Sequence, residues 1–264
     1  MATPPYHAVV FGASGINGWA LIKELLTGYP TPDTFSRVTA VLNRPLSLPD
    51  SQWPQDGRLQ VATEVDLTAD VKALQGTIKT KITGAESISH VYYAGMSGKF
   101  EKIYRKLADE VEAYKQSDDP QEECRANTEM LRGAINAIEN LSKALTCVVL
   151  ITGTKAYGLQ MLDKFPYKDQ VPLSESLPRI PPEYAKDVFY YHEVDALKDL
   201  SQGKSWTWCE VRPDVIVSAY RGPNPVGYAD HRPGRSRSHW QCSLHGPDDG
   251  HLPQSVRLRR GSGC

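Results

Sequence analysis

The sequence lacks three features that would each indicate a particular class of protein. No run approaches the roughly 20 apolar residues of a membrane-spanning helix, the net charge is only -1, and the five cysteines form no CxxC pair. These absences argue against a membrane protein, a nucleic-acid-binding protein, and a metal knuckle or disulfide framework. No metal site is predicted. Because the N-terminal residues also show no targeting pattern, we expect a reduced, cytoplasmic protein.

Strict alternation of apolar and polar residues is also scarce, which indicates strands buried on both faces of a sheet. Strand-like runs occupy 7–12, 37–44, 58–67, 89–96, 146–153 and 205–217. Helical spacing predicts helices over 17–28, 97–116, 124–145 and 187–203, and a proline-rich loop covers 165–184. Strands that alternate with helices predict the α/β class with a doubly wound parallel sheet, the Rossmann fold.

Lysine is absent after residue 217, whereas the preceding residues contain fifteen lysines. The segment 218–264 shows no helical or strand period and is rich in Arg, Gly, Pro and His. Such a composition buries too little apolar surface to offset its ordering entropy. We therefore expect one nucleotide-binding domain at 1–217 and a disordered, irregular tail at 218–264. Two origins of the tail stay open: a natural basic extension, or a shift of the reading frame near residue 218.

A glycine-rich segment, GASGING, follows the first predicted strand and opens the first predicted helix. Gly12 suits a tight turn, Gly15 lets a pyrophosphate approach the backbone, and Gly18 allows close packing of the helix on the sheet. The phosphates would then lie at the helix N-terminus, against Ser14 and Ile16. The pattern predicts a dinucleotide site, and its alternative is a glycine-rich turn without a ligand.

No acidic residue ends the second predicted strand, although NAD sites usually place one there to bind the ribose 2′-hydroxyl. The strand ends in VLNRP, so Asn43 and Arg44 offer donors, and Arg44 suits a 2′-phosphate. The nearest acid, Asp33, precedes the strand. We therefore predict NADPH as the cofactor. Asp66, after the third strand, is expected either to accept a hydrogen bond from the adenine amine or to cap a helix.

The chain also lacks YxxxK, the tyrosine–lysine pair that many reductases carry on one helix, since none of its thirteen tyrosines has lysine four residues later. Tyr190, on the helix predicted over 187–203, is the tyrosine expected near the cofactor. Lys155 follows the fifth strand directly, in ITGTKAYG. Because ligands lie at the carboxyl ends of parallel strands, these two side chains are candidates to meet over a nicotinamide. Their alternatives are a core aromatic and a solvated lysine.

GASGING, ITGTKAYG and VFYYHEVD, in this order and without YxxxK, resemble the progesterone 5β-reductase/iridoid synthase-like (PRISE) family of short-chain dehydrogenases. The resemblance covers about residues 6 to 217. It implies that Lys155 and Tyr190 are catalytic, with Tyr190 also beside the cofactor. Family members continue into a long substrate-side region at the point where this chain has its basic tail. The substrate lobe is therefore expected to be largely missing.

The resemblance also implies an NADPH-dependent reductase that acts on the activated C=C bond of a small-molecule enone or enal, for example in secondary metabolism. Two other functions stay open. One is carbonyl reduction or epimerisation on the extended short-chain dehydrogenase scaffold, which the lack of YxxxK argues against. The other is an inactive regulator that binds NADP. The sequence does not predict the oligomeric state.

Overall fold

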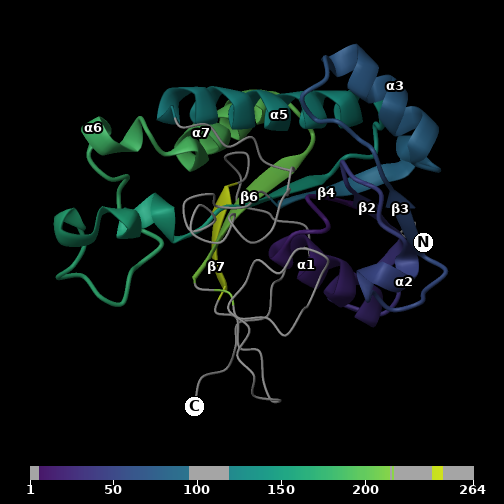
Figure 1. Cartoon of the computed structure of the whole chain (residues 1–264), viewed down its shortest axis with the longest axis horizontal. Coiled ribbons are helices and arrows are strands. Elements are labelled where there is room, and N and C mark those ends of the chain that lie inside the picture. The colour runs from purple at the N-terminus through teal and green to yellow at the C-terminus, as the bar shows by residue number, and fades with distance from the viewer. Residues whose placement is uncertain (1–5, 95–118, 215, 217–239, 246–264) are drawn as a thin grey trace.

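A computed structural model of the chain describes residues 6–94, 119–214, 216 and 240–245. These residues form one seven-stranded sheet in the order β3-β2-β1-β4-β5-β6-β7 (Figure 1). The strands are β1 (Tyr6–Phe11), β2 (Phe35–Val41), β3 (Leu59–Ala62), β4 (Ile88–Ala94), β5 (Cys147–Ile151), β6 (Thr207–Pro213) and β7 (Trp240–His245). Strands β1 to β6 are parallel, and β7 runs antiparallel to β6. The predicted α/β class and doubly wound order are confirmed.

Helices cover both faces of the sheet (Figure 1). They are α1 (Ile16–Thr27), α2 (Leu48–Ser51), α3 (Val71–Lys81), α5 (Pro120–Leu141), α6 (Pro182–Ala185) and α7 (Phe189–Ser201), with 3₁₀ turns η1 (Ala85–Ser87), η2 (Thr154–Tyr157) and η3 (Leu159–Lys164). Helices α1 and α2 lie on one face, and α3, α5 and α7 on the other. None of the helices in the described ranges is long and apolar enough to cross a bilayer.

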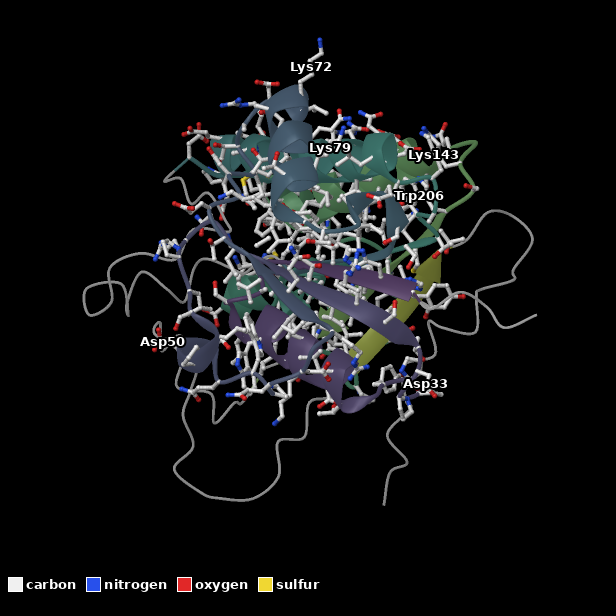
Figure 2. The ribbon with its side chains drawn as sticks, turned by 90° about the vertical axis from the view of Figure 1, so that its right-hand side faces the viewer. Asp33, Asp50, Lys72, Lys79, Lys143 and Trp206 are labelled. Carbon is white, nitrogen blue, oxygen red and sulfur yellow. The ribbon has the colours of Figure 1, made fainter. Side chains whose placement is uncertain are left out.

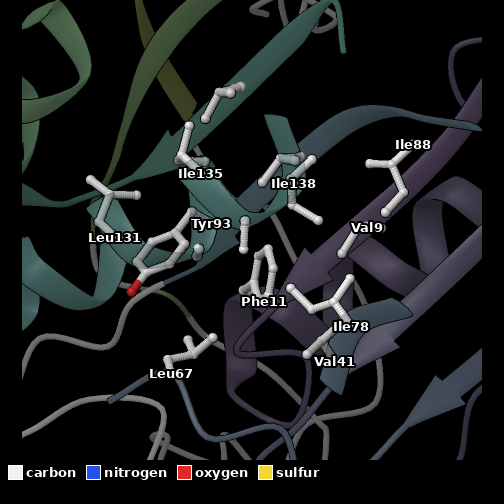
Figure 3. Packing of buried hydrophobic residues seen from close by; sticks show 14 of the residues in the cluster. Val9, Phe11, Val41, Leu67, Ile78, Ile88, Tyr93, Leu131, Ile135 and Ile138 are labelled. Atoms are coloured by element: carbon white, nitrogen blue, oxygen red, sulfur yellow. The ribbon is translucent and has the colours of Figure 1, made fainter. Parts of the chain in front are cut away.

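The central strands are mostly apolar because each of their faces meets a helix layer. In β1, Val9 and Phe11 join the core under α3, α5 and α7 (Figure 3), whereas Ala8 and Val10 join the core on the side of α1. Tyr93 of β4 contributes to the same core as Phe11, with ring centroids 6.0 Å apart. This two-sided burial explains why the sequence shows continuous apolar runs rather than alternation.

Helix α3 is absent from the elements that the sequence predicts. Only Leu74 and Ile78 of this helix are buried, so its apolar face is a narrow i, i+4 stripe. Its start is set by Asp70, whose carboxylate accepts hydrogen bonds from the amides of residues 72 and 73. Lys72 and Lys79 project outward from it (Figure 2). Because most residues of α3 are polar, its sequence shows little helical periodicity, and the N-cap residue Asp70 was the feature that could have predicted the helix.

The end of the chain differs from the prediction. Residues 218–264 were expected to hold no regular element, whereas the structure describes one strand there, β7, which pairs with β6 from Trp208↔His245 to Pro213↔Trp240. Backbone pairing to an edge strand needs no side-chain alternation, so the sequence pattern could not reveal it. The rest of that segment lies outside the described residues, so its irregular character stays a prediction. The third strand is also shorter than 58–67, and the helix predicted over 97–116 lies outside the described residues.

Candidate active site

The parallel register brings the ends of β1, β4 and β5 to one edge of the sheet. Phe11 pairs with Tyr93 and Tyr93 with Leu150, so the three strands end nearly level. The glycine-rich turn leaves β1 at this edge, and the segment carrying Lys155 leaves β5. Parallel doubly wound sheets bind their ligands at this edge.

The glycine turn has the geometry that its spacing predicts. Gly12 has φ 72°, a left-handed conformation that favours glycine. Gly15 is the N-cap of α1, and its amide donates to the Gly12 carbonyl at 3.0 Å. A Cβ on Gly18 would lie 2.2 Å from the Gly12 carbonyl oxygen and 2.7 Å from the Cα of Ala13. Gly18 is therefore required for the close approach of helix and turn.

The first turn of α1 fits a bound dinucleotide. Its leading amides have no carbonyl partners within the helix, as at any helix N-terminus, and they favour an anion. Ser14 and Ile16, the other predicted contacts, are partly exposed in this turn. Asn17 is buried there, and its Oδ1 accepts no hydrogen bond from the described residues. A buried acceptor without a donor is costly, so a ligand donor or a water at this turn would stabilise it.

The second predicted cofactor contact lies beyond β2. Asn43 and Arg44 follow the strand and are partly exposed, and Arg44 pairs with no carboxylate in the described part of the chain. Asp33 lies at the opposite end of β2, far from Asp50 and the carboxyl edge (Figure 2). Asp33 is thus too remote to bind a ribose at this edge. The preference for a 2′-phosphate that the sequence predicts at Asn43 and Arg44 stays a prediction.

Asp66 does not cap a helix, so one of its two predicted roles is excluded. Its Oδ1 accepts hydrogen bonds from the Thr68 amide at 2.8 Å and the Thr68 hydroxyl at 2.7 Å, which closes an Asx turn. The capping role belongs to Asp70, four residues later. Asp66 is exposed, and its contact with adenine stays a prediction.

Lys155 and Tyr190 lie in the same aromatic neighbourhood, as their predicted pairing requires. Lys155 is in η2, and its Nζ lies 5.8 Å from the ring centroid of Phe189. The Phe189 and Tyr190 rings meet edge to face, with centroids 4.5 Å apart. The Tyr190 hydroxyl oxygen would lie 3.5 Å from a Cβ built on Gly153, so it faces the backbone just before the turn that carries Lys155. Helix α7 therefore brings Tyr190 to the carboxyl end of β5.

The two side chains differ in exposure. Tyr190 is 1% exposed, whereas Lys155 is partly exposed. The ammonium of Lys155 rests on the aromatic face of Phe189 at a distance that permits a cation–π interaction.

Sequence reasoning missed two buried carboxylates behind this edge. Glu193 lies one turn after Tyr190 on α7, and Glu210 lies on β6. Burial, together with the charge of Glu210, raises the pKa of Glu193 well above its ordinary value. Glu210 is paired with Arg212, with Nη2 and Oε2 2.7 Å apart. The charged residues inside the otherwise apolar run TWCEVRP were the sequence signal that could have revealed Glu210 and Arg212.

A parallel sheet in this order, with a glycine-rich turn after its first strand, defines the Rossmann class of α/β domains. The family described as the PRISE-like Rossmann-fold domain matches residues 8–229. The chain therefore belongs to this family. The sequence analysis placed the resemblance at about residues 6 to 217, and the domain boundary at residue 217 stays a prediction.

Curated relatives agree with the family. The short chain dehydrogenase ausT of Aspergillus calidoustus is 38% identical over 211 residues, which are 80% of this chain and 48% of that protein. The 3-oxo-Delta(4,5)-steroid 5-beta-reductase of Arabidopsis thaliana is 26% identical over 223 residues, 83% of this chain and 49% of that protein. The chain spans about half the length of the curated relatives it matches.

Among solved structures, Gre2 of Candida albicans in complex with NADPH is similar, with a TM-score of 0.51 and 13% sequence identity. The likeness covers 81% of this chain and 59% of that chain. At this identity it shows the fold alone.

Proposed function

We propose that this chain is the cofactor-binding and catalytic part of an NADPH-dependent reductase that saturates the activated C=C bond of a small enone or enal. The observation that carries the proposal is the convergence of Lys155 and Tyr190 at the end of β5, from two different elements and without YxxxK. The match to a relative named for a 3-oxo-Delta(4,5) steroid supports the substrate class, because that name describes a C=C bond next to a ketone.

The chain's own residues would stabilise the charge that develops on the substrate. A bound reduced nicotinamide would supply a hydride to the carbon β to the carbonyl. Tyr190 would donate a hydrogen bond to the carbonyl oxygen as it becomes an enolate, and the Lys155 ammonium would add positive charge nearby. Burial of Tyr190 keeps its hydroxyl in a low-dielectric site, where such a donor is commonly worth about 3 kcal/mol.

The cofactor preference follows from the end of β2. We propose that Arg44, with Asn43, binds a 2′-phosphate and thereby selects NADPH over NADH. The phosphates would lie at the N-terminus of α1, against Gly12, Gly15 and Gly18. Arg44→Ala is expected to weaken NADPH binding by about tenfold or more, since charge-assisted hydrogen bonds contribute roughly 1.5–3 kcal/mol, and to leave NADH binding nearly unchanged. Equal losses for both nucleotides would refute this role.

The extent of the domain is part of the proposal. We place cofactor binding and the catalytic pair within residues 1–217, and we assign recognition of substrate shape mainly to residues beyond them. Small enones are therefore the appropriate probes for this chain, because they depend least on that region. The exact enone is left open by this assignment.

The test is NADPH oxidation with a panel of small enones, in the wild type and in Tyr190→Phe and Lys155→Ala. Each substitution should lower kcat by about 100-fold while NADPH still binds in a fluorescence titration. Tyr167→Phe is the comparison variant, because it also removes a buried tyrosine hydroxyl, which donates to the Pro178 carbonyl at 2.7 Å. Full activity of Tyr190→Phe on every enone that the wild type reduces would refute the proposal, and NADPH binding without any turnover would favour a regulator.

A further inference from the structure

The turn that carries Lys155 is supported by side chains from α7 and β6. We call residues 152–157 the lysine turn. At the ends of its 3₁₀ portion, the Ala156 amide donates to the Gly153 carbonyl and the Gly158 amide donates to the Lys155 carbonyl, each at 3.0 Å. A single 3₁₀ turn is weak by itself. Its position, and with it that of the lysine, must come from other contacts.

The N-terminal side of the lysine turn is tied to β6. The Thr152 hydroxyl donates to Oε1 of Glu210 at 2.7 Å, and the Thr152 amide donates to the Val211 carbonyl at 2.9 Å. Glu210 is 1% exposed, and its other oxygen accepts from Arg212 at 2.7 Å. A buried carboxylate held by both a hydroxyl and a guanidinium has little freedom to move.

The C-terminal side is held at two further points. The guanidinium of Arg212 lies over the ring of Tyr157, 5.1 Å from its centroid. The Tyr191 hydroxyl donates a short hydrogen bond to the Ala156 carbonyl and accepts one from the Ile180 amide at 3.1 Å. Tyr191 is 4% exposed, and burial raises the pKa of its hydroxyl, which keeps it a donor.

The three adjacent aromatic residues of α7 thus have separate contacts with one segment. Phe189 lies under the Lys155 ammonium, Tyr190 faces Gly153, and Tyr191 bonds to Ala156. Because Lys155 has a long side chain and is only partly buried, the location of its ammonium depends on where its backbone is fixed. A displacement of about 1 Å in a reacting group is enough to cost about 100-fold in rate.

We propose that Tyr191, Glu210 and Arg212 are positioning residues, which fix the lysine turn and so place the Lys155 ammonium relative to Tyr190. This inference rests on the proposed function, because a fixed position of the Lys155 ammonium matters for the rate only if Lys155 takes part in the reaction. It predicts that loosening the turn lowers kcat selectively and leaves NADPH binding at the glycine turn intact.

The test compares Tyr191→Phe with Tyr167→Phe in the whole chain. Both remove a tyrosine hydroxyl that donates to a backbone carbonyl in the same hydrophobic cluster, but the Tyr191 hydroxyl bonds to Ala156 of the lysine turn, whereas the Tyr167 hydroxyl bonds to Pro178. Hydrogen exchange at the amides of Ala156 and Gly158 should accelerate by about tenfold in Tyr191→Phe. It should be unchanged in Tyr167→Phe, and the amides of α5 report any global loss of stability.

Kinetics separate positioning from a merely structural role. With an enone that the wild type reduces, Tyr191→Phe should lower kcat by about tenfold or more, whereas the KM for NADPH stays within about twofold of the wild type. Accelerated exchange with an unchanged kcat would overturn the proposal, as would equal exchange in the two variants. If the wild type reduces no enone at all, the proposed function fails, and the exchange comparison still decides whether the support exists.

A second pair of variants protects the test against misfolding of Tyr191→Phe. Thr152→Val keeps the shape of the side chain and removes the hydrogen bond to Glu210, whereas Thr152→Ser retains the hydroxyl. We expect Thr152→Val to reproduce the faster exchange and the lower kcat, and Thr152→Ser to restore both. Identical behaviour of Val and Ser at this position would overturn the role of Glu210.

Discussion

Gly18→Ala is the sharpest perturbation of the cofactor turn, because the structure leaves no space for a Cβ. The added carbon would lie 2.2 Å from the Gly12 carbonyl oxygen, and Cβ contacts shorter than 3.0 Å are essentially never seen. Turn and helix must therefore separate by at least about 0.8 Å. That shift moves the helix amides away from the phosphates. Loss of one to two charge-assisted hydrogen bonds costs about 3 kcal/mol, which is about 100-fold in the Kd for NADPH.

The assay is a fluorescence titration with NADPH, accompanied by thermal denaturation of each variant. Gly76→Ala is the matched control, since Gly76 also lies inside a helix but a Cβ there would meet nothing within 4 Å. That change should leave NADPH binding unchanged and stabilise the protein by up to about 1 kcal/mol. Wild-type affinity and Tm in Gly18→Ala would refute our account of the turn.

Three further predictions concern stability. Burial lowers the pKa of His7 and of His90 to about 4. The contribution of the two neutral histidines to the free energy of unfolding is therefore fully present above pH 6.5 and is lost as the pH falls toward 4. The loss at pH 5 is about 2 kcal/mol per histidine, and urea titrations with no change between pH 7.5 and 5 would contradict it. The raised pKa of Glu193, caused by burial and by the charge of Glu210, favours folding at low pH, and this contribution is lost as the pH rises above 4.5. Glu193→Gln should therefore raise Tm at pH 8, and a lower Tm would argue against a neutral carboxyl. Asp70→Ala removes the cap of α3 and should cost about 1 kcal/mol in chemical denaturation; an unchanged midpoint would show that the cap is dispensable.

The parts of the fold that the sequence predicted are those set by local patterns. The turn around Gly12 and Gly18 was predictable because each glycine has a steric role that depends on residues within six positions. The central strands were predictable because burial on both faces leaves mostly apolar side chains. Helix α3 was missed because only Leu74 and Ile78 mark its inner face, and β7 because its pairing is made by the backbone.

The candidate site was predictable only in part, for a related reason. Tyr190 and Lys155 were selected through the motifs around them, and the structure brings their segments together, while their catalytic roles stay a prediction. The support of the lysine turn was not found, because several of its contacts join residues far apart in the chain, such as Tyr191 with Ala156, 35 positions apart, and Thr152 with Glu210, 58 positions apart. Hydrogen bonds of this kind follow from the strand order and helix packing, which local sequence patterns do not encode.

The central claim is that the pair formed by Tyr190 and Lys155 serves reduction of a C=C bond. The measurement that tests it most directly is product analysis after incubation of the wild-type chain with NADPH and a small enone. We predict the saturated ketone or aldehyde, formed in step with NADPH oxidation, and its loss in Tyr190→Phe. Formation of the allylic alcohol instead would show carbonyl reduction and would contradict the claim.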